Sequence, residues 1–291
     1  MATGKPTIRR TRTAREVVRA LANLNDQFSF FLFLEHQFDE QLRDLGHLTL
    51  SQYTSQAFHR NPFSARIHVR VGSLRPFLQA NRGVSFGAYL STSYEVAAGF
   101  TDRACQLLRS ANGPAFILPI KRGRETPEHY YRRVLTANGY SLPAKALSDT
   151  MALVRHRRNA IVHLSAMPNL KYQAVARTNG PSVNAYWKNS KIQIDFTRPT
   201  VGPPSEPDSL DLIKLLRVVT QKLDTHIASI IDVSGLISAV AHELFGEERV
   251  RMNKLVRDMR VPKLRAKLIS EFGFSGSTSM IAAAAGTVGV K

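Results

Sequence analysis

Residues 208–230, DSLDLIKLLRVVTQKLDTHIASI, carry one of the cleanest periodic patterns in the chain. Apolar residues recur here at spacings of three and four, which places them on one face of a helix. Asp208 can cap the start of this helix, which we expect to continue to about residue 243. The apolar face consists of Leu212, Leu216, Val219, Leu223, Ile227 and Ile230.

Other segments repeat the helical pattern. A long amphipathic helix is predicted from Thr13 to Gly46, and a second over about 84–108. A short helix should begin at Thr126-Pro127, and a further long helix should run from Leu142-Pro143 to Pro168-Asn169. Strand-like alternation is confined to 67–71 and, weakly, 191–196. The sequence therefore predicts a mostly α protein built as a helical bundle with four principal helices.

Charge and composition divide the chain into three parts. Residues 1–12 form a basic N-terminal arm, either a solvated tail or a contact for nucleic acid. Residues 13–245 form the helical domain, with an inserted segment at 170–205. Residues 246–291 form a basic helical extension, divided by Pro262, and a tail of small residues that is flexible or packs weakly.

The balance of charge favours a polyanionic partner. The 291 residues include 40 Lys and Arg against 22 Asp and Glu, a formal net charge of +18. Nucleic acid is the leading partner, although an anionic membrane or an acidic protein suits this charge almost as well. Cys105 is the only cysteine, which excludes an intrachain disulfide and a cysteine-based zinc site. The apolar runs are too short to span a bilayer, and we expect a soluble, cytoplasmic protein with no membrane contact.

The chemistry lies in Arg158-Asn159-Ala-Ile-Val-His163, on a basic helix. A guanidinium can hold a phosphate through two hydrogen bonds, and an imidazole can move protons near neutral pH. RNA carries its own nucleophile, the 2′-hydroxyl, so such a pair could cleave it without a metal. His163 would be the acid or base, Arg158 would bind and stabilise the phosphate, and Asn159 would orient the phosphate or the imidazole. Arg155, His156 and Arg157 would add substrate contacts, and we expect no metal and no cofactor.

This stretch resembles the Arg-x4–6-His motif of HEPN-domain ribonucleases, in which the residue after the arginine is commonly Asn, His or Asp. The resemblance implies a HEPN-like helical bundle and cleavage that leaves a 2′,3′-cyclic phosphate and a 5′-hydroxyl. It also implies a homodimer whose two Arg/His pairs line one groove. The family's typical roles are toxin of a toxin–antitoxin pair and effector of antiviral defence, with an antitoxin or activator protein as partner. Ser165 stands where some of these ribonucleases carry a tyrosine.

Several alternatives stay open. Arg158 and His163 lie five apart, roughly 140° around a helix, so they converge only through the length of arginine, a distorted helix or a second subunit. The rival function is a noncatalytic RNA-binding or nucleocapsid-like helical protein. Tyr130-Tyr131 with Arg132-Arg133 fits an RNA contact, but more readily a helix with its aromatic residues inward. The phenylalanines of the first helix fit a core plus a helix or dimer contact: Phe28, Phe30, Phe31 and Phe33.

Overall fold

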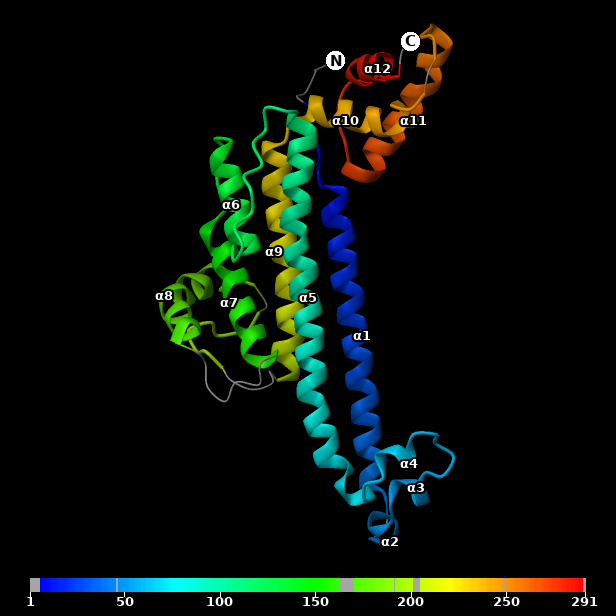
Figure 1. Cartoon of the computed structure of the whole chain (residues 1–291), viewed down its shortest axis with the longest axis vertical. Helices are drawn as coiled ribbons and strands as arrows, with labels where there is room; N and C mark the ends of the chain where they lie inside the picture. The colour runs from blue at the N-terminus through cyan, green and yellow to red at the C-terminus, as the bar shows by residue number, and fades with distance from the viewer. Residues whose placement is uncertain are drawn as a thin grey trace. The chain divides into compact units, whose positions relative to one another are not determined.

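The computed structural model describes residues 6–45, 47–162, 170–190, 192–200, 205–248 and 250–289. The chain is mostly helical, as predicted (Figure 1). The four principal helices expected from the sequence are present, and no strand longer than an isolated bridge occurs among the described residues. These principal helices are α1 (Arg12–Arg43), α5 (Leu74–Asn112), α7 (Lys145–Val162) and α9 (Glu206–Ile230).

Further helices connect and extend these four. Three of them and a turn of 3₁₀ helix link α1 to α5, α6 follows α5, and α8 follows α7 in the sequence. The remaining three helices follow α9. These further helices are α2 (His47–Ser51), α3 (Thr54–Ala57), α4 (Ser64–Ile67), η1 (Val71–Ser73), α6 (Pro127–Ala137), α8 (Leu170–Trp187), α10 (Val233–Phe245), α11 (Lys254–Phe272) and α12 (Thr278–Thr287).

The chain forms two compact units, each made of segments that are distant in the sequence. The first comprises Met1–Leu21, Glu95–Ala152 and Leu215–Lys291; the second comprises Ala22–Tyr94 and Leu153–Lys214. Several helices therefore contribute residues to both units, because each of the four principal helices crosses a boundary within its length.

The core of the second unit joins α1, α5 and α9. Phe28 packs edge-on against Phe86, with ring centroids 4.9 Å apart, and Leu32 and Ile213 complete the buried cluster. A second cluster, Leu42 with Val71 and Leu74, packs the short linking helices against the ends of α1 and α5. Burial of these side chains drives the pairing of α1 with α5, because each removes a large apolar area from water.

In the first unit, the N-terminal arm is held in place. Thr7 pairs with Ser275 as an antiparallel bridge, and the amide of Arg9 donates to the carbonyl of Phe272 over 3.1 Å. Thr11 donates through its amide and its hydroxyl to the buried carboxylate of Asp224. Described residues of the arm are thus tied to α9 and to the end of α11, which a freely solvated tail would not be.

Both predicted strands were wrong. Ile67 ends helix α4 and His68 takes a left-handed backbone conformation (φ 41°), so residues 67–71 cannot extend as a strand. Residues 192–196 are irregular because side chains take their backbone hydrogen bonds. The amide of Phe196 donates to Asn184 (3.0 Å) and that of Gln193 donates to Asp211 (3.0 Å). Lys191 lies outside the described residues.

Helix boundaries also differ from the prediction. The inserted segment 170–205 begins with an unpredicted helix, α8, which contains Pro181. Helix α5 begins at Leu74 because Pro76 falls in its first turn, where proline is tolerated. Helix α11 runs through Pro262, whose flanking Arg260 and Leu264 are both buried. Burial on both sides of the proline holds the helix together.

The helix expected over 208–243 is two helices. Helix α9 begins at Glu206, and the hydroxyl of Ser205, not Asp208, caps it by accepting from the amide of Asp208 (3.2 Å). After Ile230 the chain bends by 101°, and Asp232 caps α10 by accepting from the amide of Ser234. No single described helix has the length and apolarity to cross a membrane; α9 and α10 reach that level only as a bent pair.

Candidate active site

Helices α5 and α7 approach closely next to the predicted motif. A methyl group built on Gly87 of α5 would lie 2.9 Å from Cγ2 of Ile161 on α7, so the glycine makes room for that side chain. Ile161 and the neighbouring Ala160 are buried. This contact fixes the motif helix against α5 and determines which side chains of α5 the motif meets.

Arg158 is anchored on both sides. Its Nε donates to the hydroxyl of Ser91 on α5 over 3.2 Å, and its Nη1 donates to Oδ1 of Asn159 over 2.9 Å. Both Arg158 and Asn159 are partly exposed. The structure therefore brings two of the three predicted catalytic residues into direct contact. Both lie near the C-terminal end of α7.

His163, the third predicted catalytic residue, lies outside the described residues. Helix α7 ends at Val162, the residue that precedes it in the sequence and whose side chain is exposed. The expected approach of His163 to Arg158 stays a prediction.

Two of the predicted substrate contacts are buried. Arg157 is 5% exposed, and its Nη2 forms an ion pair with Oδ2 of Asp208 over 3.0 Å. Its Nε has no hydrogen-bond partner among the described residues. His156 is 4% exposed and stacks on Tyr172, with ring centroids 5.9 Å apart. Both side chains point into the protein, whereas that of Arg155 stays partly exposed.

The environment of His156 keeps its imidazole uncharged at neutral pH. Burial, assisted by the charges of Arg155 and Lys171, lowers the pKa of His156 to about 4. A neutral ring suits stacking against Tyr172. It is poorly suited to attracting an RNA phosphate.

Sequence reasoning missed Ser91 and the pairing role of Asp208. A serine within a long helix gives no signal of its own, because its role depends on which face of α5 meets α7. Asp208 was expected to cap its helix, and nothing in the sequence indicates that it meets Arg157, which lies two helices earlier on α7. Both contacts become visible only once the helices are packed.

The aromatic pair of α6 faces inward. Tyr130 and Tyr131 are buried, and Arg133 forms an ion pair with Glu125 and lies over the ring of Tyr130. The structural alternative considered from the sequence is therefore confirmed for the tyrosines. Among the described residues, no group of three or more His, Cys, Asp and Glu side chains is arranged to hold a metal ion.

No family model, curated protein or solved structure matches this chain. Function is therefore inferred from its own residues.

Proposed function

We propose that the chain is a metal-independent endoribonuclease whose site contains Arg158, Asn159 and His163. The observation that supports it best is the arrangement of Arg158, which is held by Ser91 and Asn159 at the end of α7. A guanidinium fixed by neighbours loses less entropy when it binds a phosphate than a freely rotating one. The residue five positions later in the sequence is the histidine that the motif requires.

The proposed reaction needs two proton transfers and no metal. The 2′-oxygen of the RNA attacks the adjacent phosphorus while a base removes its proton. The bond from phosphorus to the 5′-oxygen breaks, and that oxygen takes up a proton. The products are a 2′,3′-cyclic phosphate and a 5′-hydroxyl. His163 performs a proton transfer, and Arg158 stabilises the negative charge that develops on the phosphorane.

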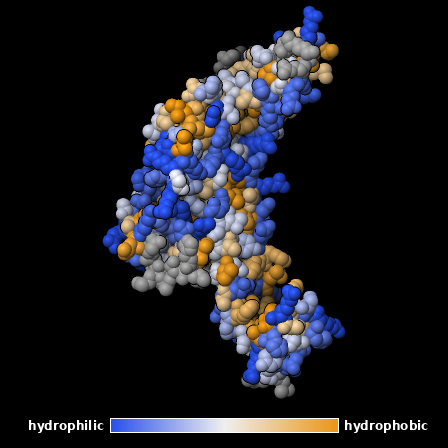
Figure 2. Space-filling model, viewed as in Figure 1, coloured by the Kyte–Doolittle hydropathy of each residue, from blue (hydrophilic) through white to orange (hydrophobic). Residues whose placement is uncertain are grey.

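Exposed aromatic residues support the homodimer. Phe28 is buried in the core, but Phe30 and Phe33 are 60% and 59% exposed and stack on one another. Leu34 adds a third exposed apolar side chain on α1. Figure 2 shows apolar surface over the part of α1 and α5 near the short linking helices. Phenylalanines exposed to this degree are typical of a surface that another chain covers.

The family that the motif resembles also suggests a biological role. A ribonuclease of this kind would act as the toxin of a toxin–antitoxin pair or as an effector of antiviral defence in the cytoplasm. Its activity would be held in check by an antitoxin, or switched on by an activator protein. In either role, the formal charge of +18 would attract RNA to the protein.

A noncatalytic RNA-binding protein is the second candidate. The large positive charge serves binding as well as cleavage. Burial of His156 and Arg157 favours neither candidate, since both functions would use exposed cations.

Cleavage of a mixed RNA pool in EDTA separates the two. We compare the wild-type chain with Arg158→Ala, His163→Ala and a control, Arg124→Ala, which removes an exposed positive charge elsewhere. Wild type and control should cleave, and each site variant should lose at least about 100-fold in rate, the usual contribution of a positioned acid or base or of a group that stabilises transition-state charge. Intact RNA in every lane, with tight binding throughout, would identify a binding protein.

A further inference from the structure

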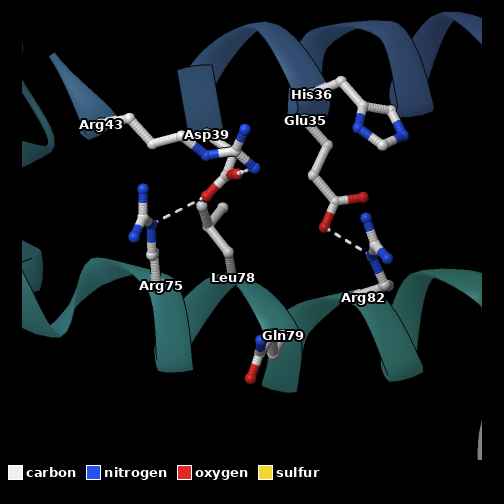
Figure 3. Close-up of a pocket in the computed structure, with 8 residues that line it drawn as sticks. All are labelled: Glu35, His36, Asp39, Arg43, Arg75, Leu78, Gln79 and Arg82. Atoms are coloured by element: carbon white, nitrogen blue, oxygen red, sulfur yellow. Dashed lines mark hydrogen bonds and ion pairs between the residues drawn. The ribbon is translucent and has the colours of Figure 1, made fainter. Parts of the chain in front are cut away.

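A polar cavity of about 260 Å³ opens between α1 and α5 within the second unit. Figure 3 shows Glu35 and Asp39 of α1 pointing toward Arg75 and Arg82 of α5. Three arginines, two carboxylates, a histidine, an amide and a single leucine line it: Glu35, His36, Asp39, Arg43, Arg75, Leu78, Gln79 and Arg82. A cavity lined almost wholly by charged and amide groups is suited to a polar, charged ligand.

One end of the cavity presents guanidinium groups. Asp39 accepts from Arg75 (Nε to Oδ1, 2.9 Å) and from Nη2 of Arg43. Burial tends to raise the pKa of Asp39, but hydrogen bonds and charge from Arg43 and Arg75 outweigh it and lower that pKa. The ionised Asp39 therefore positions both arginines. The two terminal nitrogens of Arg75 have no recorded partner among the described residues and can bind an anion.

The other end presents a buried acceptor. The side chain of Glu35 is 8% exposed, and its Oε1 accepts from Nε of Arg82 over 2.8 Å. Its Oε2 is buried and has no hydrogen-bond partner within the described part of the chain. A buried carboxylate oxygen without a partner is unfavourable, and a ligand that donates an N–H or O–H group to it would relieve that cost.

The cavity is connected to the motif helix through the first turn of α9. Glu206 pairs with Arg82 (2.9 Å) and with His36 (3.1 Å) at the cavity. Asp208, two residues later, pairs with Arg157, the neighbour of Arg158. Both contacts lie in the second unit. The ion pairs at both places therefore depend on the first turn of α9.

We propose that this cavity binds one ribonucleotide of the RNA substrate, with a phosphate on Arg43 and Arg75 and a sugar hydroxyl or base N–H donating to Glu35. Asp39 and Glu35 are four residues apart on α1, about 6 Å along the helix axis. Within one nucleotide, the phosphate and the sugar hydroxyl or base N–H groups are far enough apart to span this distance. The proposal deepens the ribonuclease function by giving the substrate a second binding site, and it rests on that function.

Inorganic phosphate alone fits the cavity less well. It could pair with the arginines, but its protons and its negative charge lie on the same small group, so a proton donated to Glu35 brings a charge that Glu35 repels. Because Oε2 of Glu35 lacks a hydrogen-bond partner among the described residues, the cavity favours a ligand that combines an anionic group with a separate N–H or O–H donor. A nucleotide, whether free or part of a strand, meets both requirements.

Calorimetric titration of the full chain tests the proposal without any cleavage. The probes are the four ribonucleoside monophosphates, inorganic phosphate, and a short 2′-O-methyl oligoribonucleotide that cannot be cleaved by its own 2′-oxygen. The variants are Glu35→Gln, which preserves shape but removes the carboxylate, and Arg75→Ala. Arg60→Ala, another exposed arginine of the same unit, is the matched control.

We expect wild type and Arg60→Ala to bind at least one monophosphate or the oligoribonucleotide. Glu35→Gln should weaken that binding about tenfold while changing phosphate binding by less than twofold; Arg75→Ala should weaken both. If Arg75→Ala does not fold, Arg43→Ala takes its place. Sensitivity seen only with the oligoribonucleotide would identify a strand as the ligand.

Absence of saturable binding by every probe at millimolar concentration, or binding that ignores both variants, would overturn the proposal. That failure would leave the ribonuclease proposal standing if RNA is still cleaved. Conversely, loss of cleavage in Arg158→Ala with unchanged nucleotide binding would show that the two sites are separate.

Discussion

Arg157 carries a buried positive charge that depends on one partly exposed carboxylate, Asp208. Asp208→Asn should destabilise the chain by about 1–3 kcal/mol, because it leaves the guanidinium buried without a counter-charge. Arg157→Met should cost less, since it removes the charge and keeps an apolar stem of similar length. Urea unfolding measures both, with the exposed Asp258→Asn as control.

Equal losses in Asp208→Asn and Arg157→Met would show that the ion pair, and not the isolated charge, determines the effect. If Asp258→Asn loses as much stability as Asp208→Asn, the loss does not come from the ion pair with Arg157, and the prediction fails.

His156 should make stability depend on pH. The pKa of its imidazole is about 4 in the folded chain, against about 6.5 when unfolded. As the pH falls below 6.5 the unfolded chain binds a proton that the folded chain refuses, so stability decreases between about pH 6.5 and 4, by on the order of 2–3 kcal/mol. His156→Phe, which keeps a ring against Tyr172, should flatten this decrease. Thermal unfolding of both proteins across that pH range measures the decrease. If wild type and His156→Phe lose stability equally as the pH falls, the prediction is refuted.

Little of the site's internal geometry could have been predicted from the sequence. The motif identified Arg158 and Asn159, which the structure brings into contact. It gave no indication that Arg157 and His156 are buried, because the motif specifies residue types and their spacing but not which face of α7 meets the core. A small rotation of a basic helix about its axis changes which of its residues are buried. For α7, packing against α8 and α9 determines that rotation.

At the scale of elements, two glycines mark close helix approaches of different kinds. A methyl group on Gly235 of α10 would lie 1.7 Å from the backbone oxygen of Ala111 on α5, which cannot move easily. On Gly87 it would meet only the end of the Ile161 side chain. Gly235→Ala should therefore cost at least about 3 kcal/mol, and Gly87→Ala about 1 kcal/mol.

Chemical denaturation of both variants checks this comparison. Comparable small losses at the two positions would mean that α10 can shift away from α5 without cost. Gly99→Ala is the control, since a methyl group there meets no atom within 4 Å.

The principal helices could be predicted because each buries one periodic apolar face, as α9 does with Leu212, Leu216 and Val219. Local patterns failed where tertiary contacts decide the backbone. Residues 192–196 alternate like a strand, but Asn184 and Asp211 take their hydrogen bonds. The helix breaks at Ile231 because Asp232 caps α10. In the sequence Asp232 is a single charged residue within a continuous apolar pattern, and it gives no sign of this cap.

For the whole molecule, the exposed phenylalanines predict self-association. Phe30→Glu with Phe33→Glu should convert a dimer to a monomer, since charges on an apolar interface are costly to bury. Sedimentation velocity measures the change. Ile120→Glu is the matched control, because Ile120 is 91% exposed and isolated from this surface in the sequence. A monomeric wild type, or a dimer that persists with both phenylalanines changed to glutamate, would show that this face of α1 does not form a dimer interface.

The most direct test of the central claim concerns the nucleophile. A short RNA with one mapped cleavage position is compared in EDTA with the same RNA carrying a single 2′-deoxynucleotide on the 5′ side of that bond. We expect cleavage of the first to leave a 2′,3′-cyclic phosphate, and the deoxy substitution to abolish cleavage at that bond while binding is unchanged. Cleavage at an equal rate in both would contradict a mechanism that uses the 2′-hydroxyl, and with it the assignment of Arg158 and His163.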